Sequence, residues 1–280
     1  MAEIESAGIT DVGQKREVNE DAFLLDDNKM LYIVADGMGG YSAGDVASKM
    51  VVETIRNCIE KAESNGEEHE LIDPDETLSI KTNRLLSGIQ LANRKVYNSS
   101  QENEKYRGMG ATVSVVYFSD DFLTVANVGD SPVYLVHRGT IEPISVLHTV
   151  VAEYEATGSE DAERIGQKYR HMLTRAMGIK ETVEADACEL QYFKGDTLII
   201  CSDGLSDKVP PEEILDIVGN EQTDKACKLL VDLANERGGD DNITVIVLKV
   251  ASIKRQRAGA IGWILGLIKG LLNRYKTKDN

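Results

Sequence analysis

Runs of apolar and alternating residues predict that the chain is built largely from β-strands. Each run has the length, the β-branched composition and the flanking turn residues that are typical of strands. Between Ala111 and Gly139 the pattern predicts three successive antiparallel strands, with turns at Ser119–Asp121 and at Gly129–Asp130. The predicted strands lie near residues 21–25, 30–35, 111–118, 121–128, 131–137, 185–192, 196–201 and 243–250.

Two longer segments have the apolar spacing of helices. One covers residues 42–61, where Ser42 and Asp45 resemble a capping box, and the other covers residues 76–98. Shorter helices are expected at 159–167, 211–218 and 223–236. Many antiparallel strands with a few one-sided helices predict an α+β fold, in which sheets pack together and helices lie on their outer faces. The polar stretch 143–180 is expected to form a surface flap.

The composition is that of a folded, soluble protein with one domain or at most two. The chain has 280 residues, of which 42% are hydrophobic and 28% charged. Its N-terminal segment lacks the basic and apolar regions of a secretory signal, so we expect a cytoplasmic protein. The four cysteines are widely spaced and form no C-x-x-C pair. This spacing favours buried thiols in a reducing compartment over a zinc site or a disulfide framework.

The net charge of −16 is distributed unevenly along the chain. Residues 252–280 contain seven basic residues and one acidic residue, Asp279, so this tail carries +6 and residues 1–251 carry −22. So acidic a body is a poor partner for nucleic acid. We therefore expect a main domain at 1–251 and a separate basic tail at 252–280.

Acidic residues stand where several predicted strands end or begin. These acids are Glu20, Asp21, Asp36, Asp130, Asp203, Asp240 and Asp241. Each Asp-Gly pair alone is most simply a turn. Together, however, the acids predict a carboxylate cluster at one edge of the sheets, and such a cluster requires cations because like charges so close cannot all ionise. Oxygen ligands without Cys or His favour Mg²⁺ or Mn²⁺ over zinc.

Seven motifs carry a resemblance to a known family. They are REVNEDA, VADGMGG, GATVSVV, VANVGDSPVY, LTRAMG, CSDGLSD and GGDDNITV. In this order they resemble the metal-dependent Ser/Thr protein phosphatases of type 2C, of the compact bacterial kind, over about residues 5–250. The resemblance implies a four-layer α-β-β-α sandwich of two antiparallel sheets flanked by helices. It also implies a dinuclear metal site at one edge.

The resemblance assigns metal ligands to five positions. Asp36 is expected to bridge two ions, with the Gly37 carbonyl on the first of them. Asp203 and Asp241 complete the second site, and Asp130 joins Asp203 at a third, weaker one. The ions are expected to be Mn²⁺ or Mg²⁺. A bridging water that they activate would attack the phosphorus.

Three further residues match the family motifs around the metals. Glu20 and Asp21 match a pair that holds metal-bound waters, and Arg16 matches the arginine that grips the substrate phosphate. A guanidinium suits this role because it donates to two phosphate oxygens at once. The alternative for Arg16 is an ordinary salt bridge with Glu17 or Glu20.

Two segments depart from the family pattern. Met38 stands where certain members carry a histidine, and its side chain cannot donate a proton, so no general acid is assigned there. The flap lacks the family's D-H-S sequence. His148 and His171, in or near the flap, are interpreted as surface or structural histidines. Arg175 of LTRAMG either contacts a phosphopeptide or packs within the protein.

The tail contains an apolar, glycine-rich run at 258–272 between basic flanks. This run is shorter than the ~20 residues of a membrane-spanning helix. Three interpretations are open: a helix in a membrane interface, a helix that docks on a partner, or packing on its own domain. Residues 254–276 are therefore a candidate for peripheral attachment to the inner face of the membrane or for partner contact.

The leading functional hypothesis is a phosphatase for phosphoserine and phosphothreonine in proteins, opposing a Ser/Thr kinase. Its partners would be phosphorylated proteins, such as the kinase or its substrates. Two alternatives are another two-metal phosphoesterase, such as a nuclease, and a catalytically silent phosphoprotein-binding module. The acidic body argues against a nuclease, and the full set of acids argues against a silent module.

Overall fold

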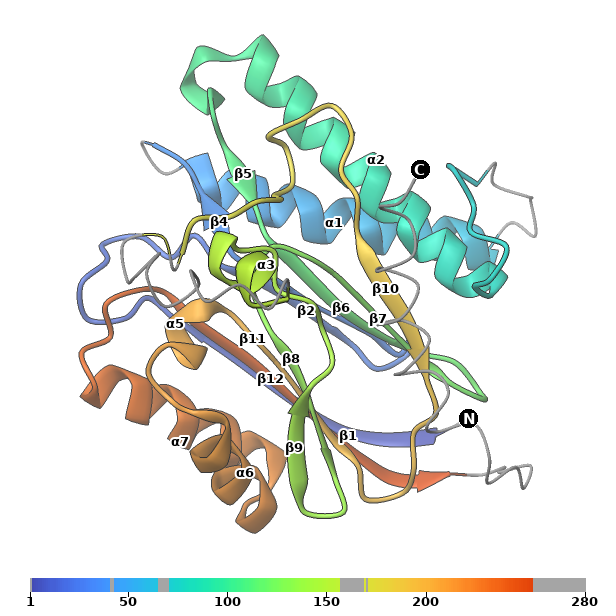
Figure 1. Ribbon diagram of the computed structural model, residues 1–280, viewed down its shortest axis with the longest axis vertical. Helices are drawn as coiled ribbons and strands as arrows, with labels where there is room; N and C mark the ends of the chain where they lie inside the picture. The colour runs from blue at the N-terminus through green and yellow to red at the C-terminus, as the bar shows by residue number, and fades with distance from the viewer. Residues whose placement is uncertain (1, 41–42, 65–70, 157–168, 170, 254–280) are drawn as a thin grey trace.

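Two five-stranded antiparallel sheets form the centre of the protein (Figure 1). The computed structural model describes residues 2–40, 43–64, 71–156, 169 and 171–253. The first sheet has the strand order β1 (Ala2–Asp11), β12 (Ile243–Ile253), β11 (Thr197–Cys201), β8 (Val133–His137) and β9 (Thr140–Pro143). The second sheet has the order β10 (Asp186–Leu190), β7 (Leu123–Val128), β6 (Val113–Phe118), β3 (Leu31–Ala35) and β2 (Ala22–Asp26).

Helices cover the outer faces of both sheets (Figure 1). The second sheet is covered by α1 (Ala43–Ser64) and α2 (Ile80–Glu102), and the first by α6 (Pro211–Asn220) and α7 (Thr223–Glu236). The shorter elements are β4 (Gly37–Met38), β5 (Gly110–Ala111), η1 (Glu104–Tyr106), α3 (Val150–Ala156) and α5 (Asp203–Ser206). This arrangement confirms the predicted four-layer α-β-β-α sandwich.

The central strands are buried on both faces, which explains their continuous apolar sequences. In β3, Leu31 and Ile33 face the core beneath α1 and α2, whereas Tyr32 and Val34 face the core between the two sheets. A third core lies between the first sheet and α6 and α7. Because alternate residues enter two different apolar layers, the strand shows no polar face.

The long helices follow the predicted apolar stripes. Residues Ala47, Val51 and Ile55 of α1 recur every four positions and are completely buried. Helix α2 begins at Ile80 rather than near residue 76, because the Ser79 hydroxyl accepts a hydrogen bond from the Thr82 amide at 3.1 Å and caps the helix there. Ser42 of the predicted capping box lies outside the described residues.

Two strands of the five-stranded sheets, β1 and β9, were absent from the sequence prediction, as was the two-residue β4. β1 forms an edge of the first sheet and pairs with β12 along its whole length. Only one side of an edge strand is hydrogen bonded, and the small and polar residues of this segment hid its alternation. β9 forms a hairpin with β8, in which Arg138 and Gly139 have φ values of 50° and 82°. Positive φ at both positions suits a tight hairpin turn.

The prediction of three successive paired strands was wrong at the third. β6 pairs with β7, but β8 pairs with β11 and β9 in the first sheet. The chain crosses between sheets after Gly129, whose φ is +105°. A residue with a side chain rarely adopts this conformation, so the predicted turn at Gly129–Asp130 is real but redirects the chain to the other sheet.

Several predicted segments fall outside the described residues. These include the helix expected at 159–167 and the tail at 254–280. β12 continues to Ile253 and thus passes the domain boundary expected at residue 251. Within the described part of the expected flap, α3 is a short helix that was not predicted. Among the described helices, none has the length and apolar character needed to cross a membrane.

Candidate active site

The predicted site residues converge on one cavity, of about 230 Å³, beside β4 and the start of α5. Seven of the eight line it, and the eighth, Asp21, lies in the protein interior. The seven are Arg16, Glu20, Asp36, Gly37, Asp130, Asp203 and Asp241. The remaining lining residues are Met38, Gly39, Thr112, His171 and Leu173. Acids that are far apart in the sequence therefore meet in space, as the strand-end pattern predicted.

Asp36 is fixed by main-chain and side-chain contacts to β5 and its neighbours. Its amide donates to the Thr112 hydroxyl at 3.0 Å, and the Thr112 amide donates to the Asp36 carbonyl at 2.8 Å. The Thr112 hydroxyl also shares a 2.7 Å hydrogen bond with that of Ser131. These bonds hold the Asp36 backbone where β3 ends, so its carboxylate projects into the cavity from a rigid support.

Gly37 is required by a close approach of three chain segments. A Cβ at this position would lie 2.1 Å from the Gly44 carbonyl oxygen and 2.5 Å from that of Glu20. The Gly37 amide also donates to the Glu20 carbonyl at 3.2 Å. The glycine after Asp36 is therefore more than a turn residue, because it lets the N-terminal end of α1 pack directly behind the site.

Gly204 plays the same part for the other acids. A Cβ there would lie 2.0 Å from the Asn242 carbonyl oxygen and 3.4 Å from the Asp241 Cβ. Close contact between the two loops brings Asp203 and Asp241 to the same side of the cavity. Asn242 also accepts the Glu20 amide on its side-chain oxygen at 2.8 Å, so it connects a third loop to the pair.

Asp21 lies beneath the cavity and is only 5% exposed. Its Oδ2 accepts hydrogen bonds from the Ser202 hydroxyl at 2.8 Å and the Thr244 hydroxyl at 2.6 Å. Among the described residues its Oδ1 has no hydrogen-bond partner. Burial is the main cause that raises the pKa of Asp21 to about 6, and the charges of Asp203 and Asp241 add to it.

Three acids that line the cavity are partly buried and also have raised pKa values. Burial, followed by the charges of neighbouring aspartates, raises the pKa of Asp36 well above its usual range. Burial and then the charge of Asp203 raise the pKa of Asp130 to about 7. Burial, then Asp207 and Asp241, raises the pKa of Asp203 as well. A group of carboxylates with these shifts favours either protons or bound cations.

The oxygen atoms that could coordinate a metal in this cavity suit hard divalent cations. Asp203 Oδ1 is buried and, like Asp21 Oδ1, has no hydrogen-bond partner within the described part of the chain. A buried oxygen that accepts no hydrogen bond is energetically costly, unless another partner such as a cation interacts with its lone pairs. Carboxylate and carbonyl oxygens at the end of β3, at the start of α5 and in the loop before β12 are the ligands that Mg²⁺ and Mn²⁺ prefer.

Arg16 lies at the exposed side of the cavity. Its guanidinium contacts Asp241 Oδ2 at 2.7 Å, and the two side chains are 49% and 36% exposed. The salt-bridge alternative named Glu17 or Glu20 as the partner, but the partner is Asp241. The guanidinium therefore stands beside the carboxylate cluster with open space in front of it.

Sequence reasoning missed His171 and Asp207. The interpretation of His171 as a surface or structural residue was incomplete, because its side chain lines the cavity from the flap. His171 Nδ1 lies 3.9 Å from Asp203 Oδ2 and 3.5 Å from Asp207 Oδ2. Ligand atoms of His171, Asp130 and Asp203 all lie within 4.8 Å of one another. For Asp207, the four-residue spacing from Asp203 within CSDGLSD was an available signal.

His148 is structural, in agreement with its interpretation. It is buried, its Nδ1 accepts the Gly129 amide at 3.0 Å, and its Nε2 lies 2.7 Å from Asp186 Oδ2. Because Nδ1 accepts, Nε2 carries the proton that is donated to Asp186. Arg175 contacts the same Asp186 oxygen at 3.3 Å, which favours packing over phosphopeptide contact. These bonds attach the flap to the turn that carries Asp130.

The LTRAMG segment closes the flap, and Met38 lies opposite it. The Met177 amide donates to the Ala111 carbonyl at 2.8 Å, and the Gly178 amide donates to Asn93 Oδ1 at 2.8 Å. A Cβ on Gly110 would lie 2.8 Å from Met38 Cε. Met38 thus contributes a thioether to the cavity wall and, as expected from its chemistry, no proton donor.

Comparison with known proteins agrees with this geometry. Residues 12–239 match the family described as protein phosphatase 2C. The chain is 34% identical to the serine/threonine phosphatase stp of Listeria monocytogenes, over 86% of this chain and 93% of that protein. It is 31% identical to protein phosphatase PhpP of Streptococcus pneumoniae, over 86% and 96%.

Solved structures show the same fold. The serine/threonine phosphatase PstP/Ppp of Mycobacterium tuberculosis superposes with a TM-score of 0.77 at 28% identity, over 89% of this chain and 99% of that one. A structure of the PstP catalytic domain in complex with two manganese ions superposes with a TM-score of 0.73, over the same shares of the two chains. Sequence, fold and the converging acids lead to one conclusion: the chain belongs to the protein phosphatase 2C family of metal-dependent protein-serine/threonine phosphatases.

Proposed function

We propose that the chain hydrolyses phosphoserine and phosphothreonine in proteins at a two-metal site formed by Asp36, Gly37, Asp203 and Asp241. The observation that carries this proposal is the gathering around one cavity of partly buried carboxylates whose pKa values are raised. Such a group needs positive charge to remain ionised near neutral pH. Bound divalent cations would supply it, and would also activate a water and neutralise the phosphoryl group.

The residues around the cations have separate tasks in this proposal. Asp36, held by Thr112, provides a rigid central carboxylate, and the Gly37 carbonyl lies next to it. Glu20 is oriented by the Gly44 amide, which donates to its Oε1 at 3.1 Å. Asp21, oriented by Ser202 and Thr244, keeps one oxygen available beneath the cavity. Glu20 and Asp21 would therefore orient solvent in the site.

Arg16 would bind the substrate phosphate. Its guanidinium is half exposed and, among the described residues, contacts Asp241 through a single terminal nitrogen. The planar group retains donors that can bind two phosphate oxygens in parallel. Since the phosphate is doubly charged near neutral pH, removing this cation should weaken substrate binding more than it affects metal binding.

A third, weaker cation site would involve Asp130, Asp203 and His171. Their ligand atoms lie within 4.8 Å of one another, and Asp130 has a raised pKa chiefly because of burial. His171 adds a nitrogen to a set that the sequence presented as oxygen only. Met38 offers no proton, so the leaving oxygen must obtain its proton from another group in the cavity or from solvent.

Manganese is the first ion to test, because a related structure contains two manganese ions, while magnesium suits the same oxygen ligands. The natural substrates would be phosphoproteins produced by a Ser/Thr kinase that this enzyme opposes.

The proposed peripheral attachment of the tail to a membrane can be tested by liposome co-sedimentation. The full chain should co-sediment and a 1–253 chain should remain soluble; equal binding would remove the membrane proposal.

The decisive experiment compares the native chain with Asp36→Asn on a phosphothreonine peptide, with and without Mn²⁺. We expect the variant to lose at least about two orders of magnitude in kcat/KM, since its carboxylate contributes to both metals. Asp232→Asn, an exposed acid on α7, is the matched control and should keep full activity. Calorimetric titration with Mn²⁺ should show weakened binding in Asp36→Asn only.

Two results would contradict the proposal. One is an Asp36→Asn variant that retains both activity and Mn²⁺ affinity. The other is a native chain that binds Mn²⁺ but cleaves no phosphopeptide, which would favour the silent binding module. Cleavage of DNA in place of phosphopeptide would favour the other phosphoesterase class.

A further inference from the structure

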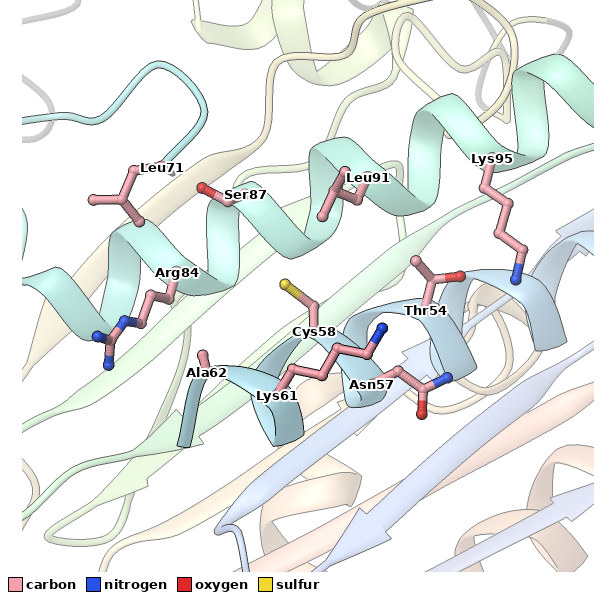
Figure 2. A pocket seen from close by; sticks show the side chains of 10 residues that line it. All are labelled: Thr54, Asn57, Cys58, Lys61, Ala62, Leu71, Arg84, Ser87, Leu91 and Lys95. Atoms are coloured by element: carbon pink, nitrogen blue, oxygen red, sulfur yellow. The ribbon is translucent and has the colours of Figure 1, made fainter. Parts of the chain in front are cut away.

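A second cavity, of about 270 Å³, lies between α1 and α2, and it shares no lining residue with the active site (Figure 2). Its lining residues are Thr54, Asn57, Cys58, Lys61, Ala62, Leu71, Arg84, Ser87, Leu91 and Lys95. We call this cavity the α1/α2 groove. We propose that it binds a small organic anion, with an apolar body between the helices and an anionic group among its three cations.

The groove is built into the helical pattern of both helices. On α1 its residues 54, 57, 58, 61 and 62 recur at three- and four-residue spacing, and on α2 so do 84, 87, 91 and 95. Such spacing places each set on one continuous face of its helix. The two faces are therefore opposed along their length, beside the apolar stripes that enter the core.

Close packing of the helices at one point forms the floor. A Cβ on Gly88 would lie 3.4 Å from the Cys58 Cβ and 3.5 Å from its Sγ, so the helices nearly touch there. Figure 2 shows Cys58 pointing toward α2 and Leu91 pointing toward α1. Leu91 is 41% exposed although it is a large apolar residue. These two side chains offer an apolar surface that a ligand could cover.

Hydrogen bonds close one wall of the groove. The Ile72 amide donates to the Ser87 hydroxyl at 3.0 Å, and that hydroxyl donates to the Asn83 carbonyl at 2.9 Å. The chain before α2 is thereby attached to the helix, and Leu71 is placed over the cavity. The groove is thus shaped by ordered backbone on three sides before any ligand enters.

Three cations and no acid line the groove. Arg84 and Lys95 lie toward its two ends and Lys61 lies between them (Figure 2). Among the described side chains, no carboxylate is within ion-pair distance of these three. Positive charge is concentrated here on a body whose net charge is −22 over residues 1–251, so the groove attracts anions that the rest of the surface repels.

Size and charge together select the ligand class. An engineered cavity of about 150 Å³ holds benzene, so the groove accommodates a body of roughly twice that volume, near the lower end of small-molecule sites. The chain's own tail is a poor occupant because it carries +6 and would meet three more positive charges. A nucleic acid is excluded by the acidic surroundings.

The test uses two dyes that share one aromatic body. Anilinonaphthalene sulfonate is anionic, and N-phenylnaphthylamine is its neutral counterpart. Both become fluorescent in apolar surroundings. We expect saturable binding of the sulfonate to the native chain. The double variant K61E/K95E should bind the sulfonate at least about tenfold more weakly, and the neutral dye with nearly unchanged affinity.

Matched variants separate the groove from general effects. K105E/K228E changes two exposed lysines elsewhere by the same charge, and it should bind the sulfonate like the native chain. Leu91→Asn should weaken binding of both dyes at least about fivefold through lost apolar contact. The same change at Leu229, a leucine of similar exposure on α7, should not weaken it. The sulfonate should also protect Cys58, but not Cys188, from alkylation, as read by peptide mass spectrometry.

The result is independent of the phosphatase assignment. K61E/K95E should retain native phosphopeptide hydrolysis and native Tm, since both lysines are exposed and lie outside the active-site cavity. The proposal is overturned if the native chain shows no saturable sulfonate binding. It is equally overturned if K61E/K95E and the native chain bind the sulfonate alike, because the cations then contribute nothing.

Discussion

The buried acid Asp21 should make the metal-free protein more stable as the pH falls from neutral, the reverse of ordinary acid unfolding. Its folded-state pKa is raised from 3.8 to about 6, mainly because burial disfavours the charged carboxylate. The folded state therefore binds a proton more tightly than the unfolded state does. Between these two pKa values the free energy of unfolding rises as pH decreases. The perturbation is removal of this titration by Asp21→Asn.

The size of the effect follows from the displacement of the pKa. About two pKa units correspond to about 3 kcal/mol, which is the full cost of the ionised Asp21 above pH 6. By pH 5 the folded protein is mostly protonated at this site and the unfolded chain is not. Roughly half of that cost, about 1.4 kcal/mol, should then be recovered. Asp130, whose pKa is raised to about 7, should act in the same direction.

The assay is urea unfolding at a series of pH values in excess EDTA. The informative quantity is the difference between the native chain and Asp21→Asn, because titrating groups that do not interact with Asp21 cancel in it, whereas neighbours such as Asp36, which carries part of its raised pKa because of Asp21, contribute to the same cluster effect. Asparagine leaves an amide in place of Oδ1, which has no partner among the described residues, so the variant carries a constant penalty of about 1–3 kcal/mol. This constant shifts the curves but leaves their pH dependence unchanged. Asp232→Asn is the exposed control.

Identical pH dependence in the native chain and Asp21→Asn would contradict this prediction. It would mean that burial does not perturb this carboxylate, for example because the interior there is hydrated. Adding saturating Mn²⁺ to the native chain should reverse the slope. Bound cations favour ionised ligands, so protons then compete with metal and stability falls as pH falls. If the pH dependence of the free energy of unfolding is the same with and without Mn²⁺, the acid cluster does not bind the metal.

Two further substitutions test the packing that positions the site. Gly37→Ala should lower the free energy of unfolding by about 1–3 kcal/mol and weaken Mn²⁺ binding, because the new methyl group would lie 2.1 Å from the Gly44 carbonyl oxygen; urea unfolding and calorimetry measure both, and unchanged values would contradict the proposed close approach. Ser79→Ala should cost about 1 kcal/mol through loss of the α2 cap while leaving Mn²⁺ affinity unchanged. A Ser79→Asn variant, which can cap the helix without adding a charge beside Glu189, should recover most of the loss in the same unfolding assay.

The strand and helix patterns predicted sheets that pack together with helices on their outer faces, and the family resemblance supplied the four-layer sandwich. Continuous apolar runs such as Leu31–Ala35 are long enough to identify as strands, and one-sided stripes mark α1 and α2. Edge strands carry a weaker signal, since one side needs no packing, and β1 was missed for that reason. The sheet to which β8 belongs could not be predicted either, because the alternation of apolar and polar residues within a strand does not specify its pairing partner.

The candidate site was predictable to a different degree. The acids were found because each interrupts an apolar run, and the family resemblance supplied their roles. His171 was missed because nothing near it in the sequence marks a partner. It meets Asp203 and Asp207 only through the fold of the flap. For Asp21, the motif identified the residue but not its burial beneath the cavity, which arises from its contacts with Ser202 and Thr244.

The Asp-Gly pairs at the strand ends combine two separate physical demands. At Asp36 and Asp203 the acid provides charge to the cavity, at a cost to the fold that shows in its raised pKa. At Gly37 and Gly204 the absence of a side chain lets the backbone of another segment occupy the space that a Cβ would need. Neither demand explains the other. An acid on a looser turn would move away from its neighbours and lower their mutual repulsion, so close backbone packing is what keeps the carboxylates together and makes the fold favour bound cations.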